Sequence, residues 1–147
     1  MPLFSKVFYM KHLEIDTDKI ISMIDNHFEN SGTNTPIDVD NISSVSISKS
    51  ILELENFIDL KKQLMNELNN FFHNVMNYES DFKITTSWFT KSQNSQSSNY
   101  HNHNNSMFSG ILYLQTDENS GDISFEDFNN RRIESNIIPL SKVVPLA

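Results

Sequence analysis

The feature that most constrains the fold is a long stripe of apolar side chains between residues 54 and 76. Apolar residues recur there at intervals of three and four, which places them on one face of an α-helix. Polar residues such as Glu55, Lys62 and Asn66 fall on the other face. We expect this helix to pack across a sheet, with its Phe and Met side chains in the core. The stripe consists of Leu54, Phe57, Ile58, Leu64, Met65, Leu68, Phe71, Phe72, Val75 and Met76.

After residue 80 the apolar spacing changes to strict alternation, which is typical of β-strands. Alternation over residues 82–89 predicts one strand. Residues 107–115 and 122–125 predict two more, and the polar residues 117–121 between them predict a turn. We therefore expect an antiparallel hairpin over residues 107–128.

The region before the long helix predicts one strand and one further helix. Residues 7–14 are rich in aromatic and β-branched side chains and predict the strand. Asp16 is suited to cap the start of a helix, and Gly32 is suited to end it. Residues 32–50 predict a polar connection that contains a short strand around residues 45–47.

Together these segments predict a single domain of the α+β class over residues 1–147. Helices near the N-terminus are expected to back antiparallel strands that form a β-sandwich or barrel-like core. Residues 129–136 predict a loop, and short apolar segments follow at residues 137–140 and 143–146.

Composition excludes several functional classes. The chain has no cysteine, which rules out disulfides, thiolate chemistry and zinc fingers. A net charge of −8 argues against a general nucleic-acid or anionic-membrane binder. No apolar run approaches the length of a membrane span, and the N-terminus lacks the features of a signal peptide. We expect a soluble, cytoplasmic protein.

Two histidines placed two positions apart, His101 and His103, are the strongest candidates for chemistry. They follow a polar stretch over residues 91–99, which we expect to be a mobile loop, and precede the predicted strand at 107–115. Side chains at positions i and i+2 of an extended chain share a face, so both imidazoles can point at one metal ion. Neutral imidazole binds zinc, copper, iron and nickel. The alternative interpretation is that both are ordinary polar residues of an Asn-rich loop.

The order of motifs around this pair resembles the Fe(II)- and 2-oxoglutarate-dependent oxygenases. The chain is most similar to members common in phages and marine bacteria, in the prolyl-hydroxylase-like branch. Trp88 before the polar loop and Asn99 before the first histidine fit the same group, and the resemblance covers residues 84–128. Its motifs are His101-Asn-His103, Ser109-Gly110-Ile111-Leu112-Tyr113-Leu114 and Ser120-Gly121-Asp122-Ile123-Ser124-Phe125.

The resemblance implies the front part of a double-stranded β-helix, or jelly roll. It implies His101 and His103 as ligands of Fe(II). It also implies that Tyr113 faces inward with Ser109 and Ile111, where relatives bind a carboxylate of 2-oxoglutarate through a tyrosine. A complete enzyme of this family uses Fe(II), oxygen and 2-oxoglutarate to hydroxylate a substrate, and it releases succinate and carbon dioxide.

The chain departs from the family pattern in its last part. Family members continue with a third metal-binding histidine and an arginine that pairs with the cosubstrate. Here Arg131 and Arg132 lie in the loop after the hairpin and not at the family's arginine position, and Lys142 is a conceivable substitute without a geometric reason to favour it. Three other histidines precede the pair: His12, His27 and His73. We expect His27 and His73 to be structural residues. The chain therefore resembles a C-terminally shortened oxygenase with a loosely binding two-histidine site.

Three functional hypotheses remain open from the sequence. The first is a dioxygenase of the non-haem iron class, or a shortened version of one. The second is a non-catalytic binding or assembly protein that keeps the front of the fold. The third is a cupin-like metalloprotein, although three Gly and four Pro are few for cupin turns. An unpaired sheet edge would also favour a homo-oligomer.

Overall fold

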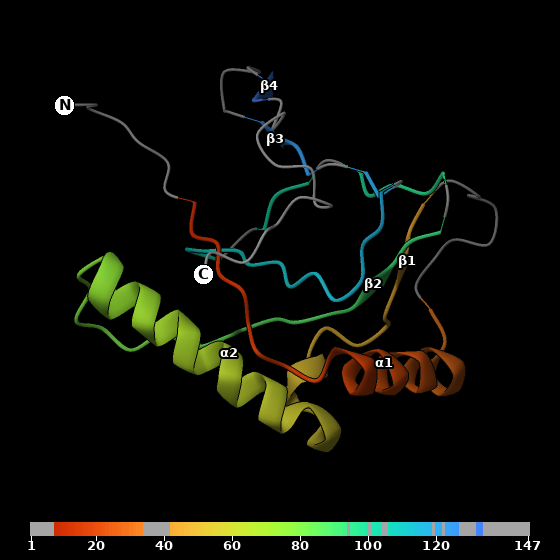
Figure 1. Ribbon diagram of the computed structural model, residues 1–147, viewed down its shortest axis with the longest axis horizontal. Helices are drawn as coiled ribbons and strands as arrows, with labels where there is room; N and C mark the ends of the chain where they lie inside the picture. Colours follow the sequence, from red (N-terminus) through yellow and green to blue (C-terminus); the bar gives the residue numbers. More distant parts are fainter. Residues whose placement is uncertain are drawn as a thin grey trace.

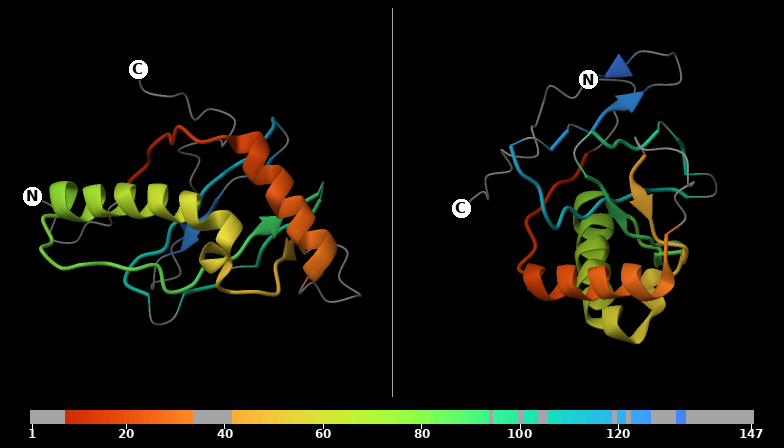
Figure 2. Two further views of the ribbon diagram at one scale, coloured as in Figure 1. Left: turned by 90° about the horizontal axis from the view of Figure 1, so that it is seen from below. Right: turned by 90° about the vertical axis from the view of Figure 1, so that its right-hand side faces the viewer.

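The computed structural model of the chain describes residues 8–33, 42–93, 95–99, 101–103, 106–118, 120–121, 123–126 and 132–133. Two helices lie on one side of the molecule, and extended segments with two small antiparallel sheets lie on the other (Figure 1). Figure 2 shows that the helices cross each other rather than run side by side. The mixed α+β class predicted from the sequence is confirmed.

Helix α1 spans Thr17–Ser31 and has both of its predicted ends. The Asp16 side chain accepts a hydrogen bond from the backbone N–H of Lys19 at 3.1 Å, which satisfies one free donor of the first turn. Gly32 has a φ of 71°, a conformation that favours glycine, and its N–H donates to the carbonyl of Phe28 at 3.0 Å. Local capping chemistry therefore sets both ends of this helix.

The predicted helix over residues 54–76 is present, but it is a regular α-helix only in its middle part. Two short 3₁₀ turns come first, η1 at Ile51–Glu53 and η2 at Glu55–Phe57. Helix α2 then spans Ile58–Asn70 and continues into a π-helical turn, η3, at Phe71–Val75. The prediction was therefore correct for the helix and wrong for its first turn.

The core forms where α1 meets the two 3₁₀ turns and the start of α2. Phe57 is only 2% exposed, and its ring packs on Phe89 with the centroids 4.9 Å apart. Extended segments cover the other side of this core, because Ile84, Leu112 and Leu114 pack against it. The buried members of the core are Ile20, Ile24, Ile51, Leu52, Phe57 and Leu60.

A second, purely aromatic cluster forms at the far end of α2. The rings of Phe72 and Phe82 stack with their centroids 3.8 Å apart, and Phe108 packs on Phe72 at 4.7 Å. The cluster therefore joins the end of the helix to two segments that follow it in the chain. Its members are Tyr9, Phe71, Phe72, Tyr78, Phe82 and Phe108.

The first small sheet pairs β1, Ser44–Val45, with β2, Thr90–Lys91, in antiparallel register. The short strand predicted around residues 45–47 is therefore confirmed, although β1 begins one residue and ends two residues earlier. The strand predicted over residues 82–89 is wrong for most of its length, because β2 begins only at Thr90 and Ser87 forms an isolated bridge with Ser50. Residues 82–86 have no partner strand in the described part of the chain, and alternation alone cannot supply one.

Serine side chains extend this pairing beyond the two short strands. Ser46 is fully buried, and its hydroxyl accepts from the N–H of Phe89 at 3.1 Å. Ser87 donates its N–H to the carbonyl of Lys49 at 2.9 Å, and its hydroxyl accepts from the N–H of Leu52 at 3.0 Å. These buried polar groups are therefore satisfied within the fold. We call the contact between residues 43–52 and 87–92 the central pairing.

The predicted hairpin over residues 107–128 is wrong. Residues 106–118 contain no strand, although Ser120 and Asp117 do form the predicted turn through a 3.1 Å backbone hydrogen bond. Strand β3, Phe125–Glu126, overlaps the strand predicted over residues 122–125 at Phe125. It pairs instead with β4, Arg132–Ile133, which lies in the predicted loop over residues 129–136. Alternation in sequence identified extended chain but not its partner.

The strand predicted over residues 7–14 is also wrong for the described residues from Phe8 onward. This extended segment contacts helix α2 instead of a neighbouring strand. Tyr9 donates to Glu67 Oε1 at 2.7 Å, and Lys11 donates to Glu67 Oε2 at 2.8 Å. The ring of Tyr9 also stacks on Phe71 with the centroids 4.6 Å apart. Side chains, not a β-ladder, hold the segment in place.

The described residues contain no double-stranded β-helix, so this part of the fold prediction is not borne out there. Their two sheets have two strands each, which is too few for a jelly roll. The apolar segments predicted at residues 137–140 and 143–146 lie outside the described residues. Among the helices of the described part, none is long and apolar enough to cross a membrane.

We predict that Phe57→Ala lowers the free energy of unfolding by about 3–5 kcal/mol, because it leaves a cavity in the core. Urea denaturation followed by circular dichroism measures this change. The matched control is Phe8→Ala, since Phe8 is exposed and its ring contacts Phe125 edge-on. We expect the control to cost about 1 kcal/mol. Equal losses in the two variants would contradict the location of the core.

A second prediction concerns acid stability. Hydrogen bonding by Lys11 lowers the pKa of Glu67 from its ordinary value of 4.5, so the folded state favours the carboxylate. As the pH falls below about 4.5, the unfolded state binds the proton first, and this part of the stability is lost. We expect the urea midpoint of the wild type to fall more steeply between about pH 5 and about pH 3 than that of Glu67→Gln. Parallel pH profiles would show that the contact contributes nothing.

Candidate functional site

The two histidines predicted as a metal pair do lie together. The rings of His101 and His103 have centroids 4.9 Å apart and planes inclined by 64°. The backbone of residues 101–103 belongs to no helix or strand. The i, i+2 spacing alone therefore brings the two imidazoles together.

The hydrogen bond of His101 sets which of its nitrogens is free for a metal. Its Nδ1 lies 2.8 Å from the carbonyl oxygen of Asn99. A carbonyl can only accept, so Nδ1 carries a proton, and in the neutral ring the lone pair is on Nε2. A backbone carbonyl on the second ring nitrogen is a common arrangement around metal-binding histidines. The donor chemistry of this residue therefore fits a divalent metal such as Fe(II).

His103 is fixed by an aromatic contact. Its ring stacks on the indole of Trp88, with the centroids 5.1 Å apart and the planes inclined by 21°. The ammonium group of Lys49 lies 5.1 Å from the centroid of the same indole. Partial burial lowers the pKa of His103, and the neighbouring His101 lowers it further. Both effects favour the neutral imidazole, which is the form that binds metals.

A third protein ligand is not found beside the pair. The described residues contain no group of three or more His, Asp or Glu side chains that could hold a metal ion. The Nε2 atom of His12 lies 3.5 Å from Glu14 Oε1 at the surface, and His73 is exposed on η3. The pair therefore fits two of the positions around a metal ion, and no other side chain of this part of the chain completes the set.

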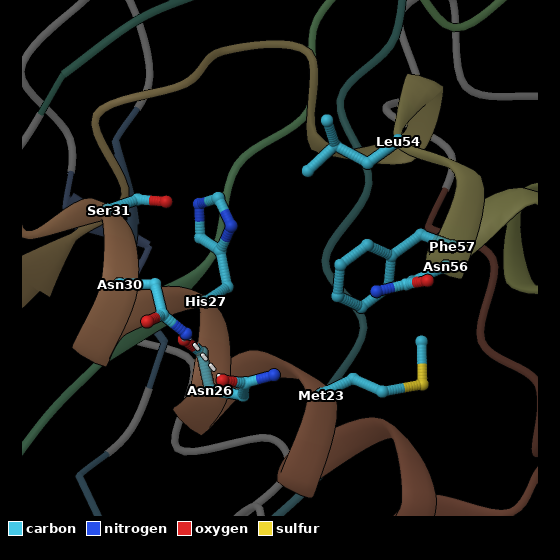
Figure 3. A pocket seen from close by; sticks show the side chains of 8 residues that line it. All are labelled: Met23, Asn26, His27, Asn30, Ser31, Leu54, Asn56 and Phe57. Carbon is cyan, nitrogen blue, oxygen red and sulfur yellow. Dashed lines mark hydrogen bonds between the residues drawn. The ribbon is translucent and has the colours of Figure 1, made fainter.

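His27 lies on α1 and lines a pocket of about 190 Å³. Figure 3 shows that the pocket lies between side chains of α1 and those around η2, and it includes none of the predicted site residues. The Nε2 atom of His27 is buried and has no hydrogen-bond partner in the described part of the chain. The pocket is lined by Met23, Asn26, His27, Asn30, Ser31, Leu54, Asn56 and Phe57.

Ser109, Ile111 and Tyr113 share the exposed face of the segment after the pair. The alternate side chains, Leu112 and Leu114, pack against the core. Partial burial raises the pKa of the Tyr113 hydroxyl, so it stays protonated and can donate a hydrogen bond at neutral pH. In the described residues, the structure shows no hydrogen bond or ring contact between this face and the histidine pair. Their role toward a cosubstrate stays a prediction.

Several predicted residues lie outside the described part of the chain. These include Arg131 and Lys142, of which Lys142 is the conceivable substitute for the family's arginine, and the side chain of Arg132 is likewise not described. Sequence analysis missed the association of Lys49 with Trp88. No local signal could have revealed it, because the two residues are far apart in the chain and meet only through the central pairing.

Comparison with known proteins gives a match to a protein family. A protein-family model described as "Putative 2OG-Fe(II) oxygenase" matches residues 86–142, which is less than half of the chain. This part of the chain is similar to those oxygenases. The match includes Trp88, His101, His103, Ser109 and Tyr113, so it contains the whole candidate site. No curated protein and no solved structure matches the chain.

Proposed function

We propose that this chain is a 2-oxoglutarate- and Fe(II)-dependent dioxygenase. The observation that carries the proposal is the histidine pair. Its two rings lie together, His101 has its Nδ1 turned to a carbonyl, and both lie inside the segment that matches the oxygenase family. The expected cofactors are therefore Fe(II) as the metal and 2-oxoglutarate as the cosubstrate.

Each residue of the site would have a separate task. His101 would bind the metal through Nε2, and His103 would supply the second nitrogen. The hydroxyl groups of Ser109 and Tyr113 are proposed to hold a carboxylate of the cosubstrate as hydrogen-bond donors. When bound, Fe(II) would supply the open coordination positions at which these enzymes activate oxygen.

The number of protein ligands limits how tightly the metal is held. Two histidines leave more of the coordination sphere to water than the three protein ligands of a typical catalytic site. The remaining positions would fall to the cosubstrate, to water or to a side chain beyond the described residues. We therefore expect weak metal binding that strengthens when 2-oxoglutarate is present.

The proposal predicts a metal-to-cosubstrate charge-transfer band when the chain is titrated anaerobically with Fe(II) and 2-oxoglutarate. We expect the band to be lost in His101→Ala and His103→Ala, because each variant leaves a single imidazole. Absorption spectroscopy measures the band. His12→Ala and His73→Ala are matched controls, since both side chains are exposed and lie outside the pair, and they should leave the band unchanged.

A flat spectrum from folded wild-type protein would contradict the dioxygenase proposal. A band that survives in His101→Ala and His103→Ala would contradict the assignment of the pair instead. The alternative function is a non-catalytic binding or assembly protein that keeps part of the oxygenase fold, and the first of these results would favour it.

We also propose that the chain forms a homo-oligomer through residues 106–118, the segment that follows the histidine pair. This segment has no strand partner in the described residues, and it exposes large apolar side chains. Met107 is 76% exposed, and Ile111 is 62% exposed. Apolar surface and unpaired extended backbone both favour association with a second copy of the chain.

Light scattering at several protein concentrations tests this association. We expect the mass of the wild type to rise with concentration and that of Ile111→Lys to rise less. Ile47→Lys is a matched control, because Ile47 is an exposed isoleucine on a different segment. A strictly monomeric wild type at every concentration would overturn the proposal.

A further inference from the structure

The stacked contact between Trp88 and His103 joins the candidate site to the body of the fold. The two rings are close to parallel, and their centroids lie 5.1 Å apart. In the described residues, the ring of His103 has no hydrogen bond, whereas His101 has one to Asn99. The orientation of His103 therefore depends on its neighbouring rings, and Trp88 is the larger of the two.

Trp88 can orient the ring of His103 because hydrogen bonds hold the residues on both sides of Trp88 in place. Ser87 donates its N–H to the carbonyl of Lys49, and its carbonyl and hydroxyl accept hydrogen bonds from the N–H groups of Ile51 and Leu52 respectively. Phe89 exchanges two hydrogen bonds with Ser46. The backbone carrying the indole is thus held at both neighbours by the central pairing.

The face of the indole has a second neighbour. The Lys49 ammonium lies over the ring at 5.1 Å, and a cation is attracted to the negative face of an indole. Lys49 also accepts the backbone hydrogen bond of Ser87 through its carbonyl. Its backbone and its side chain therefore both restrict the position of Trp88.

We propose that Trp88 is a positioning residue that holds His103 in its metal-binding orientation by ring stacking. The proposal rests on the proposed function, because it assumes that the pair binds a divalent metal. A ligand already held in its bound orientation loses less freedom on binding, so the metal is held more tightly. Removing the indole should therefore weaken metal binding without removing a ligand.

The test compares Trp88→Leu, which removes the ring, with Trp88→Phe, which keeps a smaller aromatic ring. Calorimetry with Co(II), a substitute for Fe(II) that is stable in air, measures the affinity. We expect about two- to tenfold weaker binding in Trp88→Leu, the range that an aromatic pair typically contributes, and partial recovery in Trp88→Phe. Lys49→Met should have a smaller effect than Trp88→Leu, because it leaves the stacked rings in place.

Two spectroscopic readouts do not depend on activity. Trp88 is the one tryptophan of the chain, so its fluorescence should be quenched by Co(II) in the wild type and not in His103→Ala. In the metal-free protein, the ring protons of His103 should be shifted upfield by the indole in NMR spectra. We expect that shift to disappear in Trp88→Leu while the rest of the spectrum stays folded.

The possible failures are distinguishable. If the wild type binds Co(II) and folded Trp88→Leu binds it equally tightly, the positioning role is overturned and the proposed function stands. If the His103 protons show no upfield shift in the wild type, the stack itself is contradicted. If folded wild type binds no Co(II) at all, the proposed function and the positioning role both fall.

Discussion

The central pairing between residues 43–52 and 87–92 is the contact on which the rest of the structure depends. Its two strands are short, and serine groups supply much of what a longer ladder would provide. A serine hydroxyl can both donate and accept a hydrogen bond, so it satisfies backbone groups where the two segments separate. Phe57 and Phe89 then pack against each other beside Ser46, which couples this polar contact to the hydrophobic core.

The same contact determines where the candidate site lies. The histidines lie in irregular chain, and the indole of Trp88 is what connects them to an ordered element. The histidine pair alone would be a flexible pair of ligands. Because the ring of His103 stacks on Trp88, it has a defined orientation before any metal binds. Binding sites generally use such preorganised side chains to reduce the entropy lost on binding.

The helices could be predicted from the sequence because their causes are local. Asp16 and Gly32 mark the ends of α1 through their own backbone chemistry, and the apolar stripe marks α2. The exception is Leu54, which adopts an extended conformation between two 3₁₀ turns although it fits the helical spacing. There the buried contacts of Ile51 and Phe57 outweigh helical periodicity.

The longer strands could not be placed from the sequence, because a strand needs a partner and alternation does not identify that partner. Residues 107–115 alternate clearly, yet Leu112 and Leu114 use that alternation to cover the core rather than to pair with a neighbouring strand. The histidine pair was predictable for the opposite reason, because i, i+2 geometry involves only three residues. The contact of His103 with Trp88, and of Trp88 with Lys49, depends on long-range folding. No local sequence pattern predicts it.

The contact of Glu67 with Tyr9 and Lys11 has a consequence for the order of folding. These partners are separated by 58 and 56 positions in the chain. During synthesis the first described segment emerges long before the carboxylate that it binds. It must therefore remain undocked until α2 has been made, and the ring of Tyr9, which later stacks on Phe71, stays accessible to chaperones or to other nascent chains throughout that interval.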